Sequence, residues 1–447
     1  MLQHCAMPSY RDDKAEFARL CLVSHQFLHV ARPLLYRTLD VVISSTELET
    51  VSLAAEDVDA MLISRLSTPS NCVANLVKRI NVYFDEVPPP FDYAEPLCRL
   101  VKHLTHLEEF RFLDRGREFF AEQEETQTLY DPVWHFVKTI GLFQYDTLKV
   151  LVMPQFHLSS RDTHFIFWGL ASLERYKGAV ITQLSHPDLP SRAAARLRRA
   201  YITQFRKPED IPFVLGSSSH SLRYLHLVFV KENSVVQLGG FKNLDTLVLS
   251  IKLTPTTSVV EPGQVGTDAL DAAKKQCCES PARLISTVLA TAETARSIES
   301  LRHLSLSSNC HEFLPPHFER YFLRLPASIV EFSLDSPSCH PVPWSVFVAN
   351  HRRLYPSLRK LVLRRPHGST LNDSADARHY FGIDAFEART GIEIEWIPDS
   401  VQAWKLWHER LFEGPGTDLS DDELTGKDNE EAQRQARDDF LEQCIVS

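Results

Sequence analysis

The sequence lacks the features that mark membrane-spanning and secreted proteins. Among its 447 residues, no run approaches the ~20 consecutive apolar residues that a membrane-spanning helix needs. Residues 1–14, MLQHCAMPSYRDDK, do not show the basic and then apolar pattern of a secretory signal. Nine cysteines are scattered without the spacing of a disulfide framework, which fits a reducing compartment. We therefore expect a cytoplasmic or nuclear protein that makes no membrane contact.

The sequence also lacks a basic stripe. The formal net charge is −10, and residues 413–447 hold eleven Asp or Glu against three Lys or Arg. This tail carries −8, so the rest of the chain is close to neutral. Because the sequence has no stripe of Lys and Arg to neutralise a phosphate backbone, we expect no nucleic acid partner. The acidic tail is expected to be largely disordered.

Catalytic motifs are missing as well. The sequence contains no GxGxxG, GxxxxGK[ST], HExxH or GxSxG pattern. Its most suggestive cluster is Cys310-His311 with Cys339-His340, because two Cys and two His can form a tetrahedral zinc site. These pairs lack the usual CxxC spacing, so we favour a structural role for them. We predict no catalytic residue, no cofactor and no metal ligand, and we expect that the chain is not an enzyme.

A six-residue pattern recurs along the chain: an apolar residue, two mostly polar residues, an apolar residue, any residue and a last apolar residue. The last two apolar positions are two residues apart, so they point to one face of a strand. Such a unit cannot bury that face alone and needs neighbours that share a core. The eight copies are VKRINV (77–82), LEEFRF (107–112), LKVLVM (148–153), LRYLHL (222–227), LDTLVL (244–249), LRHLSL (301–306), IVEFSL (329–334) and LRKLVL (358–363), and LERYKG (173–178) resembles a degraded ninth.

Segments with helical spacing of apolar residues lie between these copies, at 131–143, 191–205 and 280–294. Strands that alternate with helices predict an α/β chain, an irregular leucine-rich-repeat-like solenoid with a parallel concave sheet. In the copy LRHLSLSSN, Asn309 falls where the leucine-rich-repeat pattern has its Asn. An ordinary α/β domain with several buried strands remains the alternative.

The repeat domain is expected to span residues 46–412. The distances between copies are irregular, and the segment near 252–276 is the best candidate for a loop insertion, because its first half is rich in Thr, Pro and Gly. The strand-like IEIEWI (392–397) and a helix over 401–412 would close the domain. That helix is interpreted as a cap on the last repeat, with a partner-binding helix as the alternative.

The stretch AEFARLCLVSHQFLHVARPLLYRTLDV (15–41) resembles the second half of a fungal F-box segment. In that family, a helix with a Leu-Val-Ser core and an aromatic residue is followed by Ala-Arg-Pro-Leu-Leu-Tyr and then by the first strand of a repeat domain. Pro33 fits this order, since the residue before a proline is pushed out of helical geometry. The matching residues are Leu20, Leu22, Val23, Ser24, Phe27, Ala31, Arg32, Pro33, Leu34, Leu35 and Tyr36.

The resemblance implies a short helical F-box remnant and hinge over residues 1–45. It also implies a non-enzymatic protein-recognition subunit, a substrate-binding F-box-type adaptor of a Skp–cullin–F-box ubiquitin ligase that holds an unknown client protein. By the same resemblance, the Skp-type adaptor protein would contact Leu20, Leu22, Val23, Phe27, Pro33, Leu34, Leu35 and Tyr36.

The first F-box helix, LPxEILxxIL, has no counterpart in residues 1–14. Two alternatives stay open: a gene model truncated at its start, or an F-box that has lost its adaptor contact. In the second case the chain would be a leucine-rich-repeat-like interaction scaffold with no ubiquitin-ligase link. A plain cap helix, with Leu20, Val23, Phe27 and Val30 buried against the repeats, needs no F-box ancestry at all.

Overall fold

The computed structural model describes the strands and helices given below and the turns that lead into many of them. The chain divides into two compact units, residues 36–399 and residues 1–35 with 400–447. All structural statements concern the described residues, which are 36–43, 73–84, 94–114, 130–153, 158, 160–180, 195–205, 207–229, 235–251, 284, 286–308, 326–335, 355–364, 383–397, 407–408 and 410–413. In the second unit these are only 407–408 and 410–413, which are helical.

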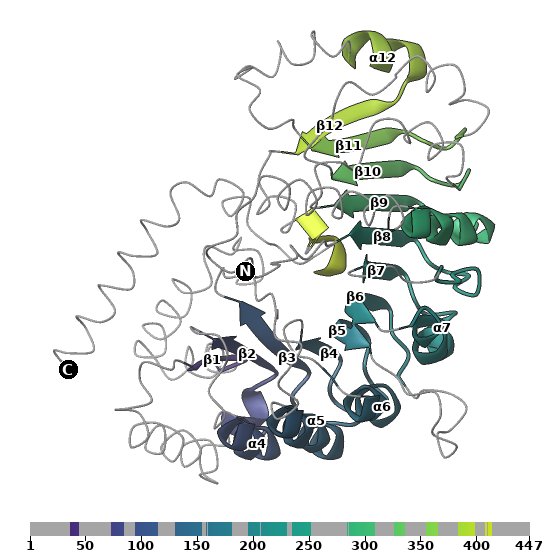
Figure 1. Ribbon diagram of the computed structural model, residues 1–447. Coiled ribbons are helices and arrows are strands. Elements are labelled where there is room, and N and C mark those ends of the chain that lie inside the picture. Colours follow the sequence, from purple (N-terminus) through teal and green to yellow (C-terminus); the bar gives the residue numbers. More distant parts are fainter. Residues whose placement is uncertain are drawn as a thin grey trace, which may run out of the picture. The chain divides into compact units, whose positions relative to one another are not determined.

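The described strands form one sheet in which every pair is parallel and each strand lies beside the next one in the sequence (Figure 1). The eight hexapeptides and the degraded copy each supply one strand, so the prediction of an α/β chain with a parallel sheet is confirmed. The twelve strands are β1 (Thr38–Ile43), β2 (Arg79–Phe84), β3 (Glu109–Asp114), β4 (Val150–Met153), β5 (Arg175–Val180), β6 (Arg199–Phe205), β7 (Tyr224–Phe229), β8 (Thr246–Ile251), β9 (His303–Ser308), β10 (Glu331–Asp335), β11 (Lys360–Arg364) and β12 (Glu393–Ile397).

Parallel neighbours need connections that cross back over the sheet, and helices make several of them. The α-helices are α4 (Ala94–His103), α5 (Tyr130–Phe143), α6 (Ser160–Gly169), α7 (Asp210–Leu215) and α12 (Ile383–Thr390), and the 3-10 helices are η1 (Val73–Leu76), η4 (Gly216–Ser218) and η5 (Ala295–Ser297). Helix α5 packs between α4 and α6 (Figure 1). It confirms the helix predicted at 131–143, and the segment predicted at 280–294 is helical at 284 and 286–294.

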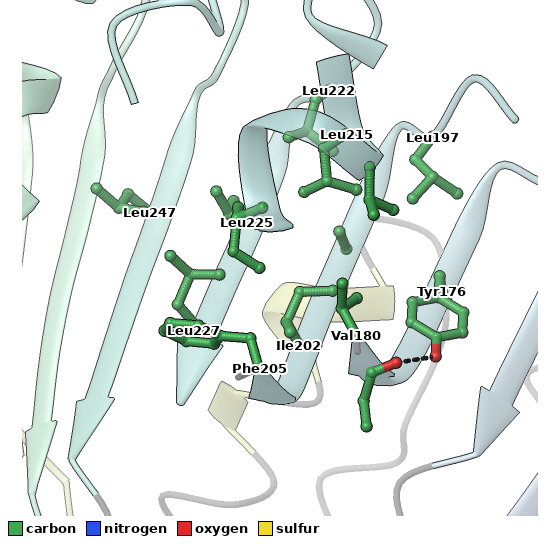
Figure 2. Close-up of a cluster of buried hydrophobic side chains, with 14 of the residues drawn as sticks. Tyr176, Val180, Leu197, Ile202, Phe205, Leu215, Leu222, Leu225, Leu227 and Leu247 are labelled. Carbon is green, nitrogen blue, oxygen red and sulfur yellow. Dashed lines mark hydrogen bonds between the residues drawn. The ribbon is translucent and has the colours of Figure 1, made fainter. Parts of the chain in front are cut away.

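The core lies between the helices and one face of the sheet. On β3, Phe110 and Phe112 are buried, and their ring centroids lie 4.8 Å and 5.5 Å from that of Phe136 on α5. The last two apolar positions of each hexapeptide supply the strand side of this core, as their spacing of two predicts. Figure 2 shows the same arrangement further along, where Ile202, Leu225 and Leu247 come from three neighbouring strands.

The degraded copy LERYKG still forms a strand, β5, because the Tyr176 ring fills the space that a side chain at Gly178 would occupy. A Cβ added to Gly178 would lie 2.6 Å from the hydroxyl oxygen of Tyr176, so tyrosine already occupies that space. The Tyr176 hydroxyl donates a hydrogen bond of 2.6 Å to the carbonyl of Ala179 (Figure 2). Burial raises the pKa of Tyr176 far above its ordinary value, so this donor stays protonated.

A continuous hydrogen-bond ladder joins the strands at the edge where they begin. For β1 to β10, the carbonyl of the residue before the strand accepts two N–H groups, one from the residue before the next strand and one from the first residue of that strand, at distances of 2.7–3.2 Å. We call these the ladder residues: Arg37, Lys78, Glu108, Lys149, Glu174, Arg198, Arg223, Asp245, Arg302 and Val330. Each one is the first polar position of its repeat or the equivalent residue, so the backbone geometry repeats even where the connections differ in length.

The repeat extends three residues further upstream than the hexapeptide. The N–H of Leu173 bonds to the carbonyl of Leu170, and Leu244 and Phe241 form the same turn. Equivalent turns bring Ala74, Ile298 and Tyr355 into the core, where all three are buried. A serine before the first apolar residue often ties one turn to the turn before it, as when the Ser172 hydroxyl donates to the carbonyl of Asp146 at 2.8 Å.

The helix predicted at 191–205 is wrong, because residues 199–205 form strand β6. Alanine and arginine favour a helix in the first half of that segment, but Tyr201, Ile202 and Phe205 are residues that fit a strand. Ala200 and Ile202 are buried, and β6 pairs with β5 and β7 on its two sides. Backbone pairing with two neighbours therefore overrides the local helical preference.

Other predictions meet the structure only in part. Strand β12 confirms the strand expected at 392–397, and the described residues of 401–412 are helical as predicted. The proposed insertion at 252–276, Asn309 and the tail beyond Glu413 lie outside the described residues. Within the described part of the chain, no helix has both the length and the apolar character that a membrane crossing requires.

Candidate recognition surface

The side chains that alternate with the core residues form the second face of the sheet, which we call the polar face. Strand register carries two rows of them from β2 to β12. The first row is Arg79, Glu109, Val150, Arg175, Arg199, Tyr224, Thr246, His303, Glu331, Lys360 and Glu393. The second row is Asn81, Arg111, Val152, Lys177, Tyr201, His226, Val248, Ser305, Ser333, Val362 and Glu395. Neighbouring strands lie about 4.8 Å apart, so consecutive members of a row can touch.

At β2 and β3 the polar face holds one carboxylate between two guanidinium groups. Oε2 of Glu109 lies 2.8 Å from Nε of Arg79 and 2.9 Å from Nη2 of Arg111. Burial, the largest single influence, acts to raise the pKa of Glu109, but Arg111 and Arg79 outweigh it and the pKa is lowered. Glu109 therefore stays ionised and fixes both arginines, so this cluster of three side chains carries one net positive charge.

Strands β5 to β8 carry a connected chain of one cation, two rings and one hydroxyl. The Nζ atom of Lys177 lies 4.8 Å from the centre of the Tyr201 ring, a cation–π distance. Tyr201 stacks on His226, with centroids 3.9 Å apart and planes inclined by 18°. Nε2 of His226 lies 2.7 Å from the hydroxyl oxygen of Ser250. Each group orients the next, so the ammonium of Lys177 is held in place on the polar face.

The last strands carry acidic groups with fewer cations. Lys360 lies 2.5 Å from Glu395, which through this contact raises the pKa of the lysine. His303 lies 3.8 Å from Glu331, an ion-pair distance rather than a hydrogen bond. The interaction with Glu331 is the largest influence on His303 and raises its pKa. Glu393 and Glu395 add two carboxylates on β12.

The middle of the polar face is buried. Tyr224 and His226 on β7 are each 1% exposed, and Val248 on β8 is fully buried. A parallel sheet is normally covered on both faces, and β7 is buried at each of its six positions. Partly exposed charged groups are therefore confined to the strands on either side of this middle.

The arrangement suits recognition of a charged protein surface. From β4 to β8 the two rows hold Arg175, Lys177 and Arg199 and no carboxylate, whereas from β10 to β12 they hold Glu331, Glu393 and Glu395 against Lys360. Such segregated charge steers partners and sets their register more than it adds affinity. Among the described residues, no three of His, Cys, Asp or Glu lie together in a group that could hold a metal ion.

Most residues predicted to be functional lie outside the described part of the chain. These are Leu20, Leu22, Val23, Phe27, Pro33, Leu34 and Leu35 of the expected adaptor contact. Both Cys-His pairs, for which we predicted a structural role, also lie outside the described residues. Tyr36 is described: it lies in a turn two residues before β1 and is 41% exposed.

Sequence reasoning missed the two rows of the polar face. The signal was present in the third and fifth positions of the hexapeptide, which alternate with the core residues. In LEEFRF these positions are Glu109 and Arg111, and in LRYLHL they are Tyr224 and His226. Only the register shows that Tyr201, from the segment expected to be a helix, lies between Lys177 and His226.

Comparison with protein-family models and with curated protein sequences finds no match to this chain.

Proposed function

We propose that this chain is a non-enzymatic protein-recognition subunit of F-box type, which acts in the cytoplasm or nucleus. Its sheet would hold a client protein and residues 15–36 would hold a Skp-type adaptor. The observation that carries the client-binding part is the segregation of exposed or partly exposed charge on the flanks of the polar face. Arg175, Lys177 and Arg199 lie on β5 and β6, and Glu331, Glu393 and Glu395 lie on β10 and β12. The adaptor part is supported by the resemblance of residues 15–41 to an F-box segment.

Two features support a leucine-rich-repeat-like solenoid as the form of the client-binding unit. Every strand pairs with its neighbours in the sequence, as expected when each repeat contacts only the adjacent repeats. The ladder residues repeat one backbone arrangement from Arg37 to Val330. A repeat array of this kind offers an extended binding surface, which suits a protein client better than a small molecule.

The proposed mechanism is proximity. A chain that binds an adaptor with one unit and a client with the other brings the client close to the enzyme that the adaptor recruits. The gain is a raised effective concentration, commonly in the mM range for short connections. The chemical step would belong to other subunits of the complex, which agrees with the expectation that this chain is not an enzyme.

Co-purification with a recombinant Skp-type adaptor tests the proposal. We expect the full chain to retain the adaptor and Val23→Asp to lose it, because a buried carboxylate would be left in an apolar contact. Arg175→Glu combined with Arg199→Glu is the matched control, since it alters the polar face and should leave adaptor capture unchanged. Failure of the unaltered chain to retain the adaptor would remove the F-box part of the proposal.

The second candidate function is an interaction scaffold with no ubiquitin-ligase link. The same polar face supports it, and it differs only in lacking the adaptor. A chain that never retains the adaptor, but whose polar-face variant loses a protein partner that the unaltered chain binds, would favour this scaffold.

A further inference from the structure

Exposed apolar side chains gather at one place on the described surface. Five large apolar residues are exposed in the described part of the chain, and three of them lie within four positions: Leu142 (60% exposed), Phe143 (47%) and Tyr145 (54%). Leu142 and Phe143 end helix α5, and Tyr145 follows in the turn before β4. We call these three residues the edge patch.

The size of the edge patch is in the range of functional patches. A large aromatic side chain offers roughly 150–250 Å², so two half-exposed rings together with the exposed Leu142 side chain present on the order of 300 Å². The largest apolar patch on an ordinary monomer covers about 300–600 Å² and is often functional. A stable protein interface needs about 800 Å² on each partner, so the patch must be the anchor of a larger contact.

Cations stand beside the apolar side chains. The Nζ atom of Lys102, in the last turn of α4, lies 5.9 Å from the centre of the Phe143 ring. Lys138 precedes Leu142 by four residues on α5, which places both on one side of that helix. Both lysines are exposed. If an apolar side chain of a partner covers Phe143 and Leu142, the residues next to it in the partner would lie close to the positive charges of Lys102 and Lys138.

A basic hollow continues from the edge patch. It measures about 330 Å³ and is lined by Lys149, Ala171, Ser172, Leu173, Glu174, Arg196, Arg198 and Ser221. It starts next to the patch, because the Ser172 hydroxyl bonds to the carbonyl of Asp146, the residue after Tyr145. Three cations and one carboxylate line it, and Arg198 Nε lies 3.7 Å from Glu174. The lining therefore has an excess of positive charge.

We propose that the edge patch and the basic hollow bind a segment of a partner protein in which one or two large apolar side chains are followed by carboxylates. The apolar side chains would cover Leu142, Phe143 and Tyr145, and the carboxylates would face Lys149, Arg196 and Arg198. This surface is separate from the polar face, and it extends the proposed role in protein recognition.

Carboxylates at the same edge favour a protein segment over an anionic membrane. Asp146 is exposed beside the patch. Glu108 lies 3.0 Å from Lys149 and also pairs with Lys78, and the hydrogen bond from Lys78 is the largest influence that lowers the pKa of Glu108. A uniformly anionic surface would repel these carboxylates, whereas a peptide can place its own charges between them.

A displayed library of random 12-residue peptides, selected against the full chain, tests the proposal. We expect the selected peptides to combine large apolar residues with Asp or Glu. Phe143→Asp should weaken their binding by about tenfold or more, as expected for an interface aromatic. Arg196→Glu combined with Arg198→Glu reverses two of the cations that line the basic hollow, so it should weaken the acidic peptides and spare neutral analogues.

Phe213→Asp is the matched control, because Phe213 is also an exposed aromatic on a helix, α7, and is 37% exposed. It should leave peptide binding unchanged. Selected peptides without acidic residues, or binding that Phe143→Asp does not alter, would overturn the proposal. So would binding to phosphatidylserine vesicles that depends on Phe143 while no peptide is selected. Because the edge-patch variants should still retain the adaptor, failure here is distinguishable from failure of the F-box proposal.

Discussion

The middle of the sheet and its two flanks use the same repeat for different purposes. In β7 and β8 every residue except Ser250 is buried, with Leu227 and Leu249 on one face and His226 and Val248 on the other. On the flanks the core side is equally apolar, but the polar face carries partly exposed ion pairs. The hexapeptide therefore fixes the strand and its core side, while the residues between the apolar positions decide whether a strand stabilises the fold or is open to a partner.

The largest loss of stability should come from a substitution in the middle of the sheet. Leu227→Ala removes a fully buried core side chain on β7 and leaves a cavity between its register partners, Ile202 on β6 and Leu249 on β8. We expect the free energy of unfolding to fall by about 2–5 kcal/mol, measured by urea denaturation.

Leu142→Ala is the control for this comparison, because the same substitution is made at a side chain that is 60% exposed. It should change the free energy of unfolding by no more than about 0.5 kcal/mol. Equal losses for the two variants would show that the middle of the sheet is not the stabilising region.

A smaller change in stability is expected when an ion pair on a flank of the sheet is removed. The pKa of His303 is raised by Glu331 first of all, with Asp245 acting in the same direction and burial and Lys360 opposing. Because the folded pKa lies above the ordinary value of about 6.5, the stabilisation is full below pH ~6.5 and is lost as the pH rises through the folded pKa.

His303→Gln should therefore destabilise the chain more at pH 6 than at pH 8. Its side chain is 37% exposed, so the difference in the free energy of unfolding should stay well below 1 kcal/mol. The pKa of His303, measured by NMR titration, should fall when Glu331 is replaced by Gln. A pKa at or below the ordinary value in the unaltered chain would contradict the ion pair.

The sheet could be predicted from the sequence because its signal is local and repeated. Two apolar residues at a spacing of two, eight times over, indicate strands that must share a core. The upstream residue of the repeat was missed, since Ala74, Phe241 and Tyr355 have little in common beyond being apolar. These residues enter the core because each begins a hydrogen-bonded turn, and the backbone can form that turn whatever the side chain is.

The remaining failures have long-range causes. Segment 191–205 looks helical by itself and becomes a strand because β5 and β7 offer backbone partners on both sides. LERYKG looks degraded because Gly178 has no side chain, and it remains a strand because Tyr176 fills the space. The chain from Lys177 through Tyr201 to His226 joins three strands, so no window of sequence contains it.

Amide hydrogen exchange of the free chain, followed by mass spectrometry, tests the central claim that the described strands form one continuous sheet in sequence order. The amides of β7 and β8 should exchange most slowly, and exchange should quicken outward to β1 and β12, the two strands that pair on one side only. Amides in β7 and β8 that exchange as fast as those of β1 or β12 would contradict a single sheet built outward from a buried middle.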